Sequence, residues 1–454
     1  MNIRLFLVLL LSPILSFAKK MDCLSIEEFL DIVDQNHPVT FQINNNLRIG
    51  ELQLKEAKGG FEPVVNANYN RKSFEGKDYY SKFGSSLVVP IWFGLSAETG
   101  YEINSGDLIN PEIRTSATGL WYSGININLV QNLTYNNRMA NLDRAKIIND
   151  MSIEQQKIVR NQLLRDAAVQ YWEWYAEYEK LVMLERILNL SQERFELTKS
   201  LYGIGENSEM DTIESQGQYL NRKISFEKQE ASFRMAQNKL NVYLWKDGIV
   251  PLEINNLVPT NDEIAFNLDM TKVDSLVQNH SLMKIANFEM NLKAVDLKMS
   301  RQKTLPKLDV NLYYLDNPGE KQKQEWYNNS YVGMKFQYPI LSIQARNSMK
   351  IKKLELENKK VDILLKQQSL SVKMQNSILN NEVLNQNLQD AKLLVISTEK
   401  LLDNEQEKFR AGETSLLKVN LRENYLINSK IKRIELFQKY QKNQHYLAWY
   451  SLYF

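Results

Sequence analysis

Apolar and polar residues alternate strictly in four short stretches of this chain. The first two lie at 65–70 and 125–129, and the other two at 307–312 and 333–338. Side chains of a strand point alternately to its two faces, so each stretch predicts a strand with one apolar and one polar face. A pore wall between lipid and water gives this pattern, and so does a half-buried soluble sheet. Alternation alone does not separate the two.

Aromatic residues gather near the ends of the predicted strands and favour the pore wall. They are Trp92, Tyr101, Trp121, Tyr122, Tyr313, Tyr314, Trp326, Tyr327 and Tyr331. Tyrosine and tryptophan are enriched where a membrane-spanning sheet meets the membrane surfaces, because their rings are amphipathic. Aromatic residues also pack protein cores, so this support is partial.

Two runs without proline or glycine follow the strands, at 125–202 and 340–411. Without its strand residues, each run leaves a helix of roughly 65 residues, which at ~1.5 Å per residue is about 100 Å long. No compact domain needs such a helix, and the abundant Leu, Ile, Lys, Glu and Gln are typical of coiled-coil association. We predict long helices at 137–203 and 345–410.

Each long helix is predicted to reverse at a glycine-containing tip. Gly203 and Gly205 lie in the first tip and Gly412 in the second. Glycine suits such a place because it adopts the left-handed backbone that ends helices. The returning helices are predicted at 207–247 and 414–451.

An internal repeat divides the chain into a first copy, 19–260, and a second copy, 261–454. At a constant shift of 243 residues, the matches are Gln35-Asn36-His37 with Gln278-Asn279-His280, Pro63 with Pro306, and Asn68 with Asn311. Each copy opens with a helical pattern, the first at 26–58. Strands are expected at 61–135 in the first copy and at 305–342 in the second.

The first copy holds about 34 extra residues, because the shift falls to 209 at Tyr122-Ser123-Gly124 and Tyr331-Val332-Gly333. The extra segment contains an alternating stretch and Phe93-Gly94, which predicts an added hairpin near 84–104. The hairpin either adds strands or projects as an outer loop, and added strands are favoured. Depending on which holds, the chain would have 4 to 6 strands.

The N-terminus has the features of a secretory signal at 1–18. Arg4 precedes an apolar run, and Ser16-Phe17-Ala18 provides a small-residue exit. No later stretch reaches ~18 consecutive apolar residues, so no transmembrane helix is predicted. Cys23 is the only cysteine, which excludes an internal disulfide. Its preceding residues lack the small apolar pattern of a lipoprotein signal, so lipid attachment is not expected.

The composition argues against several kinds of chemistry. The formal net charge is +2, with 56 Lys and Arg against 54 Asp and Glu, which gives no reason to expect a nucleic-acid partner. The only histidines are His37, His280 and His445, without further ligands at metal-site spacing, so packing or helix capping is their expected role. Phosphate-binding loops and nucleophile elbows are missing. We predict no catalytic, cofactor or metal site, and no enzyme.

The aromatic run Tyr171 to Tyr178 covers most of a helix circumference. It predicts either a helix surrounded by other elements or an aromatic face toward a partner. Packing is the favoured interpretation.

Four to six strands cannot close a membrane barrel alone, because the smallest single-chain barrels use about eight and open edges in lipid leave backbone groups unpaired. Several copies must therefore share one barrel, and helices continuing from the strands would prolong it as a pipe. This arrangement resembles the TolC-like outer-membrane channels of efflux and type I secretion systems. The resemblance covers nearly the whole mature chain. It rests on the repeat, the strand-to-helix junctions at 131–138 and 340–346, and the tips at 202–213 and 409–419.

The resemblance implies a mainly α fold with a small transmembrane β part. A homotrimer would share a 12-stranded β-barrel, continued by a long coiled-coil α-helical barrel. It would lie in the cell outer membrane, in contact with its lipid, and extend into the periplasm. There it would dock onto a periplasmic adaptor (membrane fusion) protein and an inner-membrane transporter, and export small molecules or proteins.

The resemblance also suggests where an aperture would lie. Relatives often carry aspartates on the returning helix after the second tip, but Lys418 and Leu421 occupy the matching positions here, while Asp211 holds the corresponding place after the first tip. The aperture or gate candidates are Asp211, Lys418, Arg422 and Glu423. Asp211 and Lys418 either form ion pairs between neighbouring helices that hold the aperture shut, or are solvated charges worth under ~1 kcal/mol.

The competing interpretation is a secreted coiled-coil structural or adaptor protein of the cell envelope without its own pore. It explains the long helices but not the two-faced strands and their aromatic ends. A secreted hydrolase has only abundant carboxylates in its favour.

Overall fold

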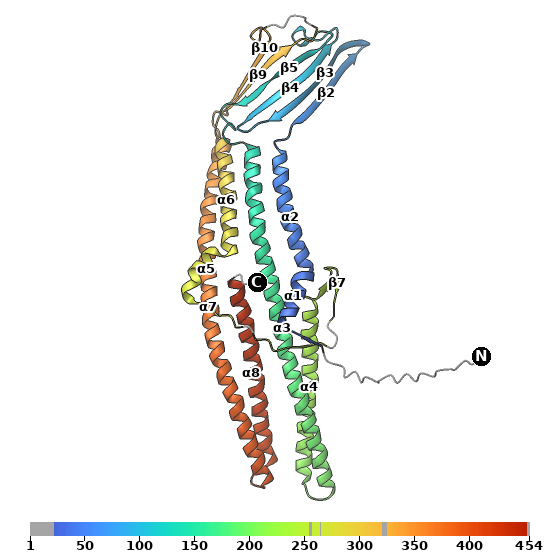
Figure 1. Ribbon diagram of the computed structural model, residues 1–454, viewed down its shortest axis with the longest axis vertical. Helices are drawn as coiled ribbons and strands as arrows, with labels where there is room; N and C mark the ends of the chain where they lie inside the picture. The colour runs from blue at the N-terminus through green and yellow to red at the C-terminus, as the bar shows by residue number, and fades with distance from the viewer. Residues whose placement is uncertain (1–21, 254–256, 264, 320–324, 452–454) are drawn as a thin grey trace, which may run out of the picture.

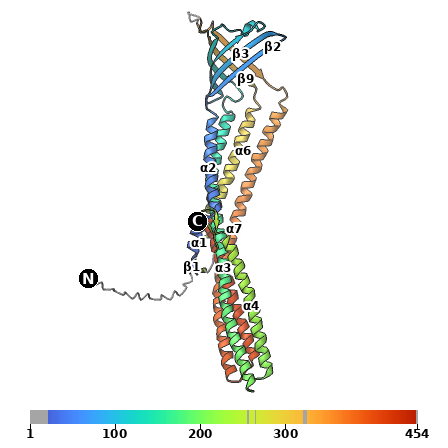
Figure 2. The same cartoon turned by 90° about the vertical axis from the view of Figure 1, so that its right-hand side faces the viewer.

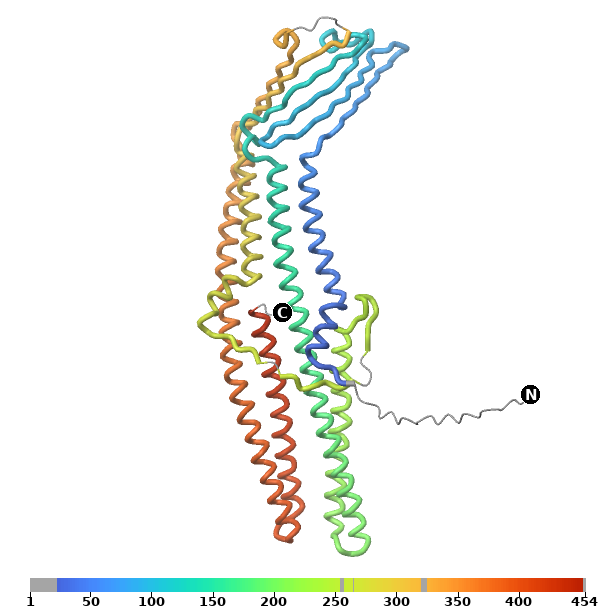
Figure 3. The backbone as a smooth tube through the Cα atoms, viewed as in Figure 1, coloured from blue at the N-terminus to red at the C-terminus, as the bar shows by residue number. Residues whose placement is uncertain are grey.

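The protein is an elongated molecule with a β-sheet at one end and helices along the rest of its length (Figure 1, Figure 3). This computed structural model describes residues 22–253, 257–263, 265–319 and 325–451. The predicted signal peptide at 1–18 lies outside the described residues. Within the described part of the chain, no helix combines the length and the apolar composition needed to cross a membrane.

Two similar sets of elements follow one another along the chain. The first set is β1 (Asp22–Leu24), α1 (Ile26–Asn36), α2 (Pro38–Gly59), β2 (Val64–Phe74), β3 (Lys77–Pro90), β4 (Leu95–Ser105), β5 (Leu120–Asn128), α3 (Asn137–Gly203) and α4 (Glu209–Asn241). The second set is α5 (Val273–Asn279), α6 (Ser281–Gln302), β9 (Lys307–Asp316), β10 (Ser330–Gln337), α7 (Ile343–Arg410) and α8 (Leu416–Tyr450). Between them lie the short strands β6 (Trp245–Lys246), β7 (Val250–Pro251) and β8 (Leu257–Pro259).

All the long strands form one antiparallel sheet in the order β10-β9-β5-β4-β3-β2. The two copies meet where β5 pairs with β9, for example at Ile125 and Leu312. The extra hairpin of the first copy is β3 and β4, which lie inside the sheet between β2 and β5 (Figure 1). The chain therefore has six strands in this sheet, and the hairpin is not a projecting loop.

Four helices continue from the strands as a single row. α2 leads into β2, β5 leads into α3, α6 leads into β9, and β10 leads into α7. Neighbours pack in the order α2, α3, α6, α7 (Figure 1). Farther from the sheet, α4 packs along α3 and α8 along α7, and the two hairpins touch through α3 and α8. The view turned by 90° shows the hairpin tips at the end opposite the sheet (Figure 2).

The helix predicted at 26–58 is in fact two helices, α1 and α2. Pro38 has no backbone N–H to donate and restricts the preceding residue to extended backbone, so His37 has φ −74° and ψ 137°. The second copy breaks at the equivalent place between α5 and α6. There His280 has φ −65° and ψ 138°, although Ser281 follows it instead of proline.

Both repeated histidines cap the helix that follows the break. His37 Nδ1 accepts a hydrogen bond from the backbone N–H of Val39 at 3.2 Å, and His280 Nδ1 accepts one from Leu282 at 3.2 Å. These bonds satisfy N–H groups that the first helical turn leaves without a partner. Of the two expected roles, packing or helix capping, the structure shows capping for His37 and His280.

The first returning helix is shorter than the predicted 207–247, because α4 ends at Asn241. A small hairpin of β6 and β7 follows, and its turn places Asp247 at φ 54° and Gly248 at φ 70°. Asp-Gly is a strong signal for such a turn, since both central residues need positive φ. The end of the helical pattern was therefore visible in the sequence at this dipeptide.

The largest apolar core surrounds the aromatic run of α3 at mid-length. Tyr171, Trp172 and Trp174 are fully buried there, together with Phe29 of α1 and Leu240 of α4. The Tyr171 hydroxyl donates to the backbone oxygen of Leu24 at 2.8 Å, which ties the paired strands β1 and β8 to α3. The favoured interpretation of 171–178 as a packing segment is confirmed.

Candidate channel wall and helix tips

One face of the six-stranded sheet is apolar from edge to edge. The register places one row of neighbours at Ile125, Leu312 and Val332, and another at Val65 and Leu87. Val65 is 75% exposed and Val332 63% exposed. Further large apolar side chains exposed on this face are Tyr69, Phe83, Trp121, Met334 and Phe336. An apolar surface of this extent marks a region that meets lipid or another protein.

The opposite face of the same strands is polar. It carries Asn66, Asn68, Asn70, Ser86, Ser96, Glu98, Asn126, Asn128, Asp309, Asn311, Lys335 and Gln337. Because the pleat places these residues opposite the apolar face, the sheet has one surface suited to lipid and one suited to water.

Hydrogen bonds join the strands across the polar face. Glu98 of β4 accepts from Asn126 Nδ2 of β5 and from the Tyr313 hydroxyl of β9, each at 2.8 Å. The Tyr122 and Tyr313 rings pack edge-to-face at 5.4 Å. A Cβ at Gly100 would lie within 3 Å of the Tyr122 ring and of the Ser85 backbone oxygen, so the position of this ring depends on glycine. This network joins the inserted β3–β4 hairpin to the neighbouring strands β5 and β9.

Aromatic pairs lie at both ends of the sheet. Trp92 stacks on Phe61 at 4.7 Å beside the helices, and Tyr101 packs on Trp121 at 5.1 Å toward the opposite end. A strand of eleven residues such as β4, tilted by ~40°, rises about 28 Å, close to the ~25 Å apolar band of membrane-spanning sheets. Tyr122 and Tyr313, by contrast, lie on the polar face, so part of the aromatic set expected at the membrane surfaces has another role.

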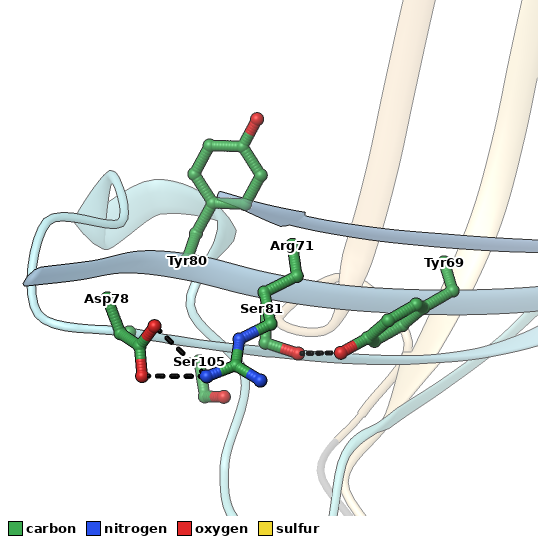
Figure 4. Close-up of a pocket in the computed structure, with 7 residues that line it drawn as sticks. Tyr69, Arg71, Asp78, Tyr80, Ser81 and Ser105 are labelled. Atoms are coloured by element: carbon green, nitrogen blue, oxygen red, sulfur yellow. Dashed lines mark hydrogen bonds and ion pairs between the residues drawn. The ribbon is translucent and has the colours of Figure 1, made fainter. Parts of the chain in front are cut away.

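A shallow hollow of about 230 Å³ lies on β2 and β3, near the end of the sheet farthest from the helices (Figure 4). Arg71 Nη2 pairs there with Asp78 Oδ2 at 3.0 Å, and Ser81 Oγ lies 3.5 Å from the Tyr69 hydroxyl. Both charged side chains are more than half exposed, so water screens the pair and it contributes little to stability. We interpret these contacts as holding β2 and β3 together.

Glycine forms the turn at each helix tip. Gly205 has φ +81° and its N–H donates to the backbone oxygen of Tyr202 at 3.0 Å. Gly412 has φ +75° and donates to Phe409 at 3.0 Å. Gly203 is the last residue of α3 and does not have positive φ. The left-handed residue of the first tip is therefore Gly205.

The aperture candidates Asp211 and Lys418 start the two returning helices but do not pair within the described chain. Asp211 accepts from Ser208 Oγ at 2.7 Å, and its own N–H donates to the same oxygen at 3.1 Å, so it belongs to the N-terminal cap of α4. Lys418 lies exposed in the first turn of α8.

Arg422 and Glu423 each pair with a long helix instead. Arg422 Nε lies 3.5 Å from Glu405 of α7, and Glu423 accepts from Arg194 of α3 at 3.0 Å. The hydroxyl of Thr414 donates to Glu405 at 2.7 Å, and this bond together with Arg422 lowers the pKa of that carboxyl.

A polar network links the two helical hairpins near their tips. Besides Glu423, Arg194 donates to Asn420 at 3.2 Å, and the Asn420 amide donates to Glu214 of α4 at 2.9 Å. Arg222 of α4 donates to Asn424 at 2.7 Å, and burial lowers its pKa. Sequence reasoning missed these residues, because partners about 200 positions apart leave no local pattern. Of the four aperture candidates, Glu423 is the one that the structure places in this network.

Solved structures share this architecture, whereas neither the protein-family models nor the curated proteins match the sequence. A membrane protein from Pseudomonas aeruginosa aligns with TM-score 0.69 and 13% identity, over 94% of this chain and 93% of its own. The CmeC outer membrane channel of Campylobacter jejuni aligns with TM-score 0.68 and 10% identity, over 94% and 86%. The MtrE outer membrane channel of Neisseria gonorrhoeae gives 0.67 and 13%, over 94% and 88%.

The chain has the fold of the TolC-like outer-membrane channels. At these identities the likeness concerns the fold, and it confirms the predicted class: mainly helical, with a small sheet continued by long helices. Two of these neighbours are named as outer membrane channels. Among the residues that the structure describes, no group of three or more His, Cys, Asp and Glu side chains could hold a metal ion.

Proposed function

We propose that this chain is the outer-membrane exit duct of an export system, built from several copies that share one wall. The observation that carries the proposal is a sheet with one apolar and one polar face that continues directly into four long helices. Such a sheet separates lipid from water, and helices that prolong its strands extend the wall away from the membrane. The sheet would lie in the outer membrane and the helices in the periplasm.

Partner copies are needed because the sheet has two open edges. Among the described strands, β2 pairs only with β3 and β10 only with β9. Each edge therefore leaves a row of backbone groups unsatisfied, and in lipid each such group costs several kcal/mol. Pairing β2 of one copy with β10 of the next satisfies both rows. Three copies, the number that the resemblance implies, would give a wall of 18 strands.

The outermost helices of the row support the same assembly. α7 exposes Ile343, Ile351, Leu354, Val361, Leu364 and Leu365, and α2 exposes Phe41, Ile49 and Leu52. Side chains of this kind on a helix face need a partner surface. Because α2 and α7 are the two ends of the row, α7 of one copy would cover α2 of the next.

The helix tips would form the periplasmic aperture. Asp211 and Lys418 do not meet within one described chain, so any ion pair between them would join neighbouring copies. The network of Arg194, Asn420 and Glu423 would hold the two hairpins of each copy together. Cargo would enter here from an inner-membrane transporter through a periplasmic adaptor, partners that the resemblance implies.

The test is the behaviour of the full chain in a Gram-negative host. We expect the protein in the outer-membrane fraction, as a detergent-resistant trimer that dissociates on heating, and ion conductance after insertion into planar bilayers. The alternative, a poreless coiled-coil adaptor, predicts a water-soluble protein without conductance. That result would refute the duct.

A further inference from the structure

The hairpin of β3 and β4 has no helix of its own. In the described chain, β2, β5, β9 and β10 each join one helix of the row. β3 and β4 are joined instead by a short turn at 91–94, on the side of the sheet that faces the helices (Figure 1). Six strands therefore stand on four helices, whereas the family pattern of a 12-stranded trimer implies four strands per chain.

The hairpin is bonded into the wall at several levels. At its turn, the Gly94 backbone oxygen accepts from the N–H of Asn128 at 3.1 Å. Along β4, Glu98 bonds to β5 and β9 on the polar face, and Thr99 Oγ1 lies 2.7 Å from Ser123 Oγ on the apolar face. Contacts on both faces exclude a flap that lies over the sheet.

The added strands change the width of the wall. Strands spaced ~4.8 Å apart and tilted by ~40° cover about 6 Å of circumference each, so four strands span about 25 Å and six span about 38 Å. Two added strands per copy therefore lengthen the wall by about half, whatever the number of copies.

We propose that the β3–β4 hairpin widens the membrane part of the duct by about half relative to a wall with four strands per copy. The mouth then admits bulkier cargo than a wall with four strands per copy would admit. This inference rests on the proposed function, because it requires copies that close one wall.

The topology allows the hairpin to be removed cleanly. β2 runs antiparallel to β3 and β4 antiparallel to β5, so β2 and β5 are themselves antiparallel. Deleting residues 75–105 leaves 106–119 as the connection and keeps both edge strands. The variant can therefore close with four strands per copy.

The experiment compares the full chain with the Δ75–105 variant in planar bilayers, with neutral polyethylene glycols of graded size added from the sheet side. Barrel diameter grows roughly linearly with strand number, so the deletion should lower the largest diameter admitted by about a third. Polymers added from the tip side should give the same limit for both proteins. An equal limit from the sheet side would overturn the inference. Absence of any channel in the full chain would instead refute the proposed function.

Thiol labelling decides the question if the deletion variant does not assemble. In a Cys23→Ser background, Ser86→Cys and Ser96→Cys lie on the polar face, and Ser85→Cys and Ala97→Cys on the apolar face. A membrane-impermeant maleimide should label only the polar-face pair in outer membranes opened to the reagent. Equal labelling of all four would place the hairpin outside the wall and overturn the inference.

Discussion

At the scale of single residues, two buried histidines are held in the neutral form. Burial lowers the pKa of His280 and of His445 to about 4, because the charged ring would lose its hydration. His445 Nε2 also accepts a hydrogen bond from Trp172 Nε1 at 2.9 Å, which requires an unprotonated nitrogen. His280 caps α6 through Nδ1 in the same neutral state. Protonating either ring in the folded protein would remove an acceptor.

We expect the free energy of unfolding to decrease as the pH falls from about 6.5 to about 4. In this window the unfolded chain binds a proton at each histidine and the folded chain does not, so stability is lost by up to roughly 3 kcal/mol per histidine. Denaturant unfolding of the detergent-solubilised protein across this range measures it. His445→Gln keeps an acceptor and should show a shallower dependence. Equal slopes in both proteins would contradict the assignment.

The Arg194 guanidinium is expected to hold the two hairpins together. Arg194→Ala removes its bonds to Asn420 and Glu423 and leaves Glu423, whose side chain is 13% exposed, without its cation. Losing such charged hydrogen bonds costs about 1–3 kcal/mol. In bilayers, the resting conductance should rise. Arg186→Ala, at an exposed position of the same helix, is the matched control, and an equal change in both variants would argue against a role for Arg194.

At the scale of elements, the tips and breaks depend on single residues whose backbone preferences are strong. The Pro38 break and the Asp247-Gly248 turn both follow local rules that the sequence displays. At Pro38 the apolar period runs across the break, so the pattern alone predicts a continuous helix. The equivalent break in the second copy, at His280, carries no proline and could be inferred only from the repeat.

Alanine substitutions at the tip glycines compare positions with and without a left-handed backbone. Gly205→Ala and Gly412→Ala should each destabilise the protein by about 1 kcal/mol, because an L-residue is strained at φ +81° or +75°. An added Cβ meets nothing within 4 Å at either position, so strain is the only cost. Gly203→Ala, at the end of α3 and equally open, should be neutral or slightly stabilising. Thermal unfolding measures the difference, and three equal shifts would rule out the backbone explanation.

At the scale of the whole molecule, the two faces of the sheet should differ in how well they tolerate a charged side chain. Met334→Arg introduces a charge on the apolar face, which costs about 2–4 kcal/mol near the middle of a membrane. We expect the detergent-resistant oligomer of this variant to dissociate at a lower temperature. Gln337→Arg places the same side chain on the polar face of the same strand and should leave the oligomer unchanged. Similar losses in both variants would speak against a lipid-facing surface.

The sequence by itself determined the elements and their two-fold order. Alternation at 65–70 and 307–312 identified the strands, and the absence of proline and glycine over about 65 residues identified α3 and α7, because both signals are local consequences of side-chain direction and backbone preference. The tip turns followed from glycine for the same reason.

Only the tertiary structure decided how these elements meet. It placed the extra hairpin between β2 and β5 instead of outside the sheet, and it brought Arg194 to Glu423 and Trp172 to His445. These contacts join residues more than 200 positions apart. They depend on strand order and on which helix faces are buried, and these are properties of the assembled chain that no local pattern encodes.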